Sequence, residues 1–195
     1  MFSKSIWESV SIMMNFPRWL LISAFIFFSC IIIGFLAPIN IDIESVAPLG
    51  DIAEDLDSFS SPVVFLIILI NNLIAISFAF FLSPVLCIIP LFSLVVNGLI
   101  IGIVGGIVVE QESFLYLLAG ILPHGIFEIP ALLIALAAAL NFGFITLRGL
   151  LKKETRSLIL PGFVTSAKYL AIYAGLLIPA AFIETFVTPI LLGVL

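Results

Sequence analysis

Charged side chains are scarce in this chain of 195 residues: 10% are Asp, Glu, Lys or Arg, whereas 63% are hydrophobic. A soluble core of this size could not bury so much apolar surface, which excludes a soluble globular protein. The mean hydropathy of +1.39 indicates several membrane crossings. Because each crossing takes about 20 apolar residues, the length allows roughly five of them. We therefore expect an all-α, polytopic membrane bundle that forms a single integral membrane domain over residues 1–195, without a soluble catalytic domain.

Histidine and cysteine are almost absent, with one histidine and two cysteines in the whole chain. Cys30 and Cys87 lie in apolar stretches without C-x-x-C spacing, so we predict neither a zinc site built from them nor a disulfide. The sequence also lacks the H-E-x-x-H motif of zinc proteases and the G-x-S-x-G turn of serine hydrolases. Every aspartate lies within residues 40–61, which leaves none in an apolar run for aspartyl proteolysis. These absences predict a protein that is not an enzyme and needs no cofactor.

The few charges that are present predict the orientation in the membrane. The segment 40–61 holds six acidic residues and neither lysine nor arginine, which is typical of a translocated loop. Lys4 and Arg18 precede the first apolar run, so we expect the N-terminus in the cytoplasm, and both the loop 40–61 and the C-terminus outside. The acidic net charge gives no support for nucleic-acid binding. The densest basic cluster, the topology anchor on the cytoplasmic side of the plasma membrane, consists of Arg148, Lys152, Lys153 and Arg156.

Apolar runs predict where the chain crosses the bilayer. The run 113–147 is too long for one straight crossing and is interrupted by Pro123, Gly125 and Pro130. We therefore expect a half-helix over 113–122, a break at residues 123–125, and then the fourth crossing. The first three predicted crossings cover residues 19–37, 61–82 and 91–109, the first of them preceded by an amphipathic segment at the membrane interface.

The last apolar stretch, residues 158–195, contains Pro161, Gly162 and Lys168 before its main apolar run. We expect a kink near the inner surface and then one final outward crossing. An alternative with two very short crossings around Pro179 would place the C-terminus inside, but each would be near the lower length limit of about 17 residues.

Polar side chains inside the predicted crossings are the best pointers to function, because lipid penalises them by several kcal/mol when they are charged. Glu128 and Glu184 fall in the fourth and fifth crossings, and His124 precedes Glu128 by four residues, which places the two on one helix face. These three side chains are also the candidate metal ligands. Asparagines in membranes usually brace neighbouring helices. The remaining members of the predicted intramembrane polar site are Asn71, Asn72 and Asn97.

Small residues repeat at four-residue spacing in the third predicted crossing, at Gly98, Gly102 and Gly106. This small-xxx-small pattern lets helix backbones approach closely, within one chain or between two. It predicts a helix-packing face and makes a homodimer a reasonable expectation.

The stretch LPHGIFEIPA at residues 122–131, with Asn97-Gly98 before it and Ile183-Glu184 and Thr188-Pro189 after it, resembles the stage II sporulation protein M family of multi-pass membrane proteins. The pair Asn71-Asn72 also fits that family's pattern. The resemblance implies a compact bundle of about five helices, and it implies that His124, Glu128 and Glu184 belong to one motif set. In spore-forming bacteria the namesake works with wall-degrading partners during engulfment. Similar proteins occur in organisms without spores, so the resemblance implies no role in sporulation here.

Three functions remain open at this point. The first, which is the one that we predict, is a non-enzymatic scaffold that organises other membrane or envelope proteins. The second is a proton-coupled or cation transporter or channel, in which His124, Glu128 and Glu184 line a hydrated path. The third is metal-assisted membrane enzymology, with the same side chains holding a divalent ion.

Overall fold

The computed structural model describes residues 2–37, 59–85 and 87–194, with side chains described from residue 16 onward. Within these ranges the chain is helical and contains no strand. Its elements, in order, are α1 (Phe2–Leu36), α3 (Ser61–Phe81), α4 (Ile88–Gln111), α5 (Phe114–Leu151), the 3-10 helix η1 (Lys153–Leu158), α6 (Ile159–Phe186) and α7 (Thr188–Leu192).

Five helical segments of the described chain are long and apolar enough to cross a membrane. This confirms the predicted all-α membrane architecture. The segments are Phe16–Leu36, Ser61–Phe81, Ile88–Gln111, Phe114–Leu151 and Lys153–Leu192. The loop 40–61, on which the predicted orientation depends, lies almost entirely outside the described residues.

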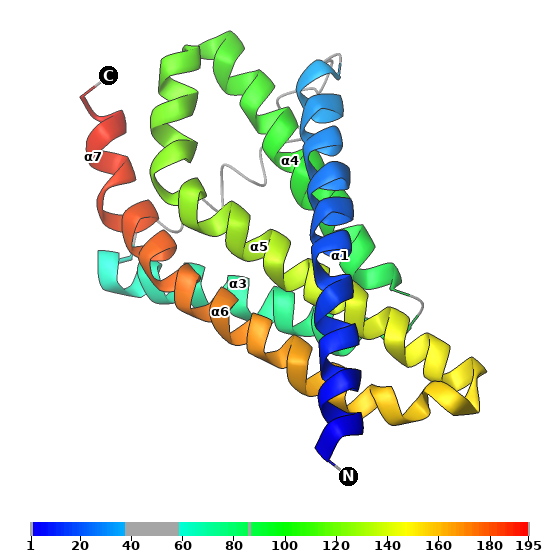
Figure 1. Cartoon of the computed structure of the whole chain (residues 1–195). Coiled ribbons are helices and arrows are strands. Elements are labelled where there is room, and N and C mark those ends of the chain that lie inside the picture. Colours follow the sequence, from blue (N-terminus) through cyan, green and yellow to red (C-terminus); the bar gives the residue numbers. More distant parts are fainter. Residues whose placement is uncertain (1, 38–58, 86, 195) are drawn as a thin grey trace.

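The helix α5 occupies the centre of the bundle (Figure 1). In its most apolar 18-residue window, 67% of the residues are buried, whereas the share is only 17–22% in the corresponding windows of the other four segments. The alanines of the run 135–140 allow this, because their small side chains let α1, α3 and α6 approach the α5 backbone closely. A helix surrounded on most sides can present side chains to several neighbours at once.

The helix α5 does not break at residues 123–125, although the sequence predicts a break there. The helix α5 runs unbroken from Phe114 to Leu151 through Pro123 and Pro130, and it bends instead of ending (Figure 1). A proline removes one hydrogen bond and forces a kink, but the turns on both sides keep their own bonds, and neighbouring helices support the bent geometry. The bend also suits the length, since 38 residues extend about 57 Å and a hydrocarbon core is about 30 Å thick.

The C-terminal stretch forms one continuous helix through Pro179, followed by the short α7. This geometry favours the single final crossing over the alternative of two short ones. The N-terminal segment likewise continues directly into the first crossing, because α1 includes Pro17 without interruption.

The helices α1 and α4 pack backbone to backbone through three glycines. A Cβ on Gly98 would lie 2.7 Å from the carbonyl oxygen of Phe27 and 2.8 Å from Cys30 Cβ. A Cβ on Gly102 would collide with the carbonyl oxygen of Ile31, and Gly34 of α1 is equally crowded from the α4 side. Gly98 and Gly102 therefore pack within the chain, while Gly106 is only half-buried. The homodimer that these glycines suggested stays a prediction.

Candidate functional site

Three titratable side chains meet where α5 lies against α6. One ligand atom each of His124, Glu128 and Glu184 lies within 4.8 Å of the other two. Because α5 stays helical through its bend, His124 and Glu128 are one turn apart on the same face, with 3.9 Å between Nε2 and Oε2. Glu184 reaches the same place from α6. The structure therefore brings together His124 and Glu128, which are one turn apart on α5, and Glu184, which lies 56 residues after Glu128 in the chain.

A third helix contributes Asn72, which lies on α3. Its side-chain Nδ2 donates a hydrogen bond to Oε1 of Glu128 at 3.3 Å. The hydroxyl of Tyr173 on α6 donates to the backbone carbonyl of Asn72 at 2.8 Å, and Tyr173 is only 2% exposed. A buried tyrosine hydroxyl thus fixes the turn of α3 that presents the amide to the carboxylate.

The start of α7 contributes a hydroxyl on the other side of the imidazole. His124 Nδ1 lies 3.5 Å from Oγ1 of the buried Thr188, so the two ring nitrogens face different partners. Thr185, next to Glu184, has a buried hydroxyl with no hydrogen-bond partner in the described part of the chain. The polar group formed by Asn72, His124, Glu128, Tyr173, Glu184 and Thr188 is called the polar cluster below.

The polar cluster holds two acidic groups and no lysine or arginine among the described residues. No lysine or arginine among the described residues forms an ion pair with Glu128 or Glu184. With neutral His124 and ionised carboxylates the charge is −2, and protonation of the imidazole reduces it only to −1. Ionised carboxylates without a matching cation are unfavourable in a low-dielectric region, so the arrangement favours uptake of a proton or a metal cation.

Two asparagines of the predicted site lie elsewhere. Asn71 is exposed on α3, on a different face from its neighbour Asn72. Asn97 donates to the backbone carbonyl of Ser93 at 2.8 Å, one turn earlier in its own helix α4. This local bond satisfies an amide in the membrane without a partner from another helix.

Sequence reasoning missed Tyr173 as a member of the cluster. A signal was available in the spacing, because Tyr173 precedes Glu184 by 11 residues, which is about three helical turns and returns to the same face. Thr188 follows Glu184 by four residues, and only the family resemblance points to it in the sequence. The spacing could not predict that α3 packs against this site and brings Asn72 to Glu128.

The basic residues from which we predict the cytoplasmic side lie at and just after the C-terminal end of α5. Arg148 is in the last turn of α5, and the exposed Lys152 and Lys153 follow it. Arg156 in η1 donates from Nε to the carbonyl oxygen of Gly149 at 3.2 Å, which helps close the turn between α5 and α6. The polar cluster is separated from these charges by several turns of α5 and α6.

Residues 23–189 match the sequence profile of the family described as Stage II sporulation protein M. The chain belongs to this family. It is also similar to an uncharacterized protein of Methanocaldococcus jannaschii, with 36% identity over 98 residues. That alignment covers 50% of this chain and spans 55% of the length of the archaeal relative. No solved structure matches. The match to the family includes every member of the polar cluster, and together with the five apolar helices it identifies a membrane protein.

Proposed function

We propose that this member of the Stage II sporulation protein M family binds a cation at the polar cluster and transports it across the membrane. The observation that carries the proposal is the convergence of His124, Glu128 and Glu184 within 4.8 Å. A bundle that needs only bracing can use amides and hydroxyls, which cost much less in lipid than carboxylates do. Two carboxylates and an imidazole at one point are better explained by an ion that they share.

The chemistry of the cluster suits either a proton or a divalent metal ion. Two carboxylates that lie this close favour sharing one proton, and the imidazole can pass it on. One imidazole nitrogen and two carboxylate oxygens also form a ligand set suited to Zn²⁺ or Mn²⁺. Ligand atoms around a tetrahedral Zn²⁺ lie about 3.4 Å apart, so small side-chain rotations would close the observed spacing.

The proposed path opens from the outer face. In the orientation that we infer from the basic residues, the N-terminal end of α5 is extracytoplasmic. Glu128 is 14 residues from Phe114 and 23 from Leu151, which places it closer to that outer end. Thr185 and Thr188 extend the line of polar groups toward the C-terminal end of α6 and α7, which lies on the same outer side.

Flux measurements in liposomes test this proposal. The protein is reconstituted in sealed vesicles, with an internal pH dye for protons and an internal metal-sensitive dye for Mn²⁺ or Zn²⁺. We expect the Glu128→Gln and Glu184→Gln variants to lose at least about tenfold in flux, because an amide can neither release a proton nor neutralise a cation. The dye that responds in the unchanged protein identifies the ion.

The matched control is Glu110→Gln, because Glu110 lies exposed at the end of α4, outside the polar cluster. Its flux should stay within about twofold of the unchanged protein, as for most exposed substitutions away from a site. Circular dichroism and gel filtration establish that each variant is folded. A folded Glu128→Gln or Glu184→Gln protein with unchanged flux would overturn the proposal.

The second candidate is the non-enzymatic scaffold for membrane or envelope partners. It is favoured by the contacts of the polar cluster themselves, because Tyr173, Asn72 and Glu128 join three helices and His124 adds α7. In that case the unchanged protein gives no more flux than protein-free vesicles. The substitutions at Glu128 and Glu184 would then lower the thermal stability of the bundle and have no flux to reduce.

A further inference from the structure

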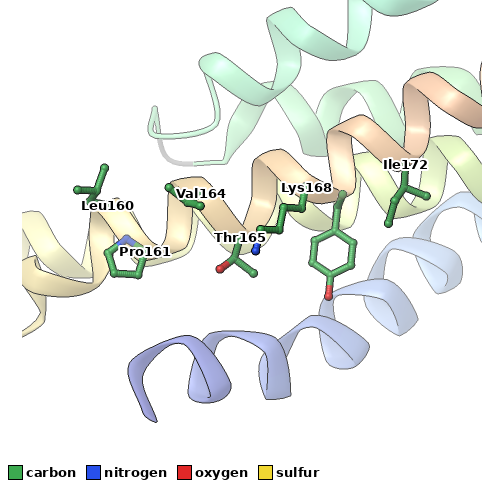
Figure 2. Close-up of a pocket in the computed structure, with 7 residues that line it drawn as sticks. Leu160, Pro161, Val164, Thr165, Lys168 and Ile172 are labelled. Atoms are coloured by element: carbon green, nitrogen blue, oxygen red, sulfur yellow. The ribbon is translucent and has the colours of Figure 1, made fainter. Parts of the chain in front are cut away.

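A groove runs along the first turns of α6, at the opposite end of this helix from Glu184 of the polar cluster. It encloses about 510 Å³ and faces the N-terminal turns of α1 (Figure 2). This volume lies within the range of small-molecule sites, about 300 to 1,000 Å³. The lining residues are Leu160, Pro161, Val164, Thr165, Lys168, Tyr169 and Ile172. Four of the seven are apolar, and the other three contribute one cation and two hydroxyl groups.

Lys168 is the only charged side chain among these lining residues. It is exposed, and it forms no ion pair with any acidic residue that the structure describes. Figure 2 shows its ammonium group extending back toward Thr165, in the direction of the start of α6. A lysine within an apolar helix that directs its charge toward the membrane surface is placed to meet a negative group there.

The described residues around the groove carry more positive than negative charge. Leu160 and Pro161 follow η1 directly, so the groove begins beside the basic cluster of residues 148–156, which contains the single acidic residue Glu154. On the opposite side Tyr169 stacks on Phe16 of α1, with ring centroids 3.7 Å apart and planes inclined by 5°. Arg18, exposed two residues after Phe16, adds another positive charge to this end of the molecule.

We propose that this groove binds one anionic phospholipid of the cytoplasmic leaflet. The phosphate lies at Lys168 and the hydroxyl of Thr165, and an acyl chain lies against Val164 and Ile172. The charge argues for an anionic headgroup, and the apolar walls argue for the attached hydrocarbon rather than a free anion. This site is independent of the cation path, and it adds a lipid partner to a membrane protein without assuming transport.

Native mass spectrometry of the protein in detergent tests the proposal. Phosphatidylglycerol and phosphatidylcholine with identical acyl chains are added in equal amounts, and the bound fraction of each is read from the spectra. We expect the unchanged protein to retain phosphatidylglycerol preferentially, and the Lys168→Met variant to lose about fivefold of that preference, since one lysine near a membrane surface contributes about 1 kcal/mol. Lys168→Arg keeps the charge and should keep most of the preference.

The control is Lys153→Met, which removes an equally exposed lysine from the basic cluster but does not alter the groove lining. Its effect should be much smaller than that of Lys168→Met. Equal losses in the two variants, or equal retention of both lipids by the unchanged protein, would contradict a specific site.

Free glycerol phosphate should not displace the lipid, and displacement at equal concentration would contradict the proposed role of the acyl chain. The Glu128→Gln variant should bind the lipid normally, so failure of either proposal leaves the other testable.

Discussion

The hydroxyl of Tyr173 connects two different kinds of contact. It donates a hydrogen bond to the backbone carbonyl of Asn72, and the side chain of Asn72 donates one to Glu128 on α5. The contact between α6 and α3 therefore positions the amide that binds the Glu128 carboxylate. Tyr173 does not need to touch a cation in order to influence its binding. It acts as a positioning residue for Asn72.

At the residue scale we predict that Tyr173→Phe lowers the free energy of unfolding by about 1 kcal/mol, the usual contribution of one hydrogen bond in a protein interior. Cation binding should weaken as well, since Asn72 loses its anchor. Unfolding by titration with SDS in mixed micelles measures the first effect, and flux in liposomes measures the second.

Tyr169→Phe is the matched control for this substitution. Tyr169 lies on the same helix, and phenylalanine preserves its ring stack on Phe16. If Tyr173→Phe is no less stable than Tyr169→Phe, the hydrogen bond to Asn72 is not a stabilising contact.

Residue patterns predicted part of the polar cluster for clear physical reasons. Helical periodicity alone places His124 and Glu128 together, because they are four residues apart. The cost of carboxylates in lipid identified Glu184 as unusual but could not place it beside Glu128. That distance depends on how α5 and α6 pack, which no local pattern contains.

At the scale of the helices, α1 and α4 approach so closely at their glycines that no room is left for a side chain. A side chain at Gly102 would meet backbone atoms of Ile31 and Phe35, and neither can move without displacing the whole helix. Small residues allow this packing where larger ones would separate the helices.

We predict that Gly102→Ala destabilises the protein by about 1 to 3 kcal/mol, the usual cost of overpacking a close contact. Gly175→Ala should be neutral or slightly stabilising, because nothing lies within 4 Å of the added Cβ and alanine favours helix. Thermal unfolding of the two variants in the same detergent measures the difference. Similar stabilities for both would show that α1 and α4 do not depend on close backbone contact.

The number of long helices could be predicted from the sequence because each apolar run must satisfy its backbone inside the membrane. The continuity of α5 could not be predicted in the same way. Pro123 and Gly125 are helix breakers by local rules, yet the packed neighbours of α5 retain the helical course and convert the expected break into a bend.

At the scale of the whole molecule, the five apolar segments place the two ends of the chain at opposite ends of the bundle (Figure 1). An odd number of crossings has this consequence in any membrane. Which end faces the cytoplasm follows from the basic residues and remains our inference. The absence of enzymatic activity and the presence of protein partners are likewise predictions.

We predict that a cysteine introduced at Gly193 reacts with a membrane-impermeant maleimide in intact cells, whereas one at Lys153 reacts only after the cells are opened. Both positions are exposed. The native Cys30 and Cys87 are first replaced by alanine, so that each protein carries one thiol. The reverse labelling pattern would invert the orientation, and the cation would then enter the polar cluster from the cytoplasm.

The interlocked backbones of α1 and α4 also restrict how the protein can respond to an ion. Close backbone contact at Gly34, Gly98 and Gly102 favours movement of these two helices as one rigid body. The polar cluster lies instead among α3, α5, α6 and α7, where side chains donate the hydrogen bonds between the helices. In the transport that we propose, a hinge that opens and closes around the ion would therefore lie on that half of the bundle, with the α1–α4 pair as its fixed frame.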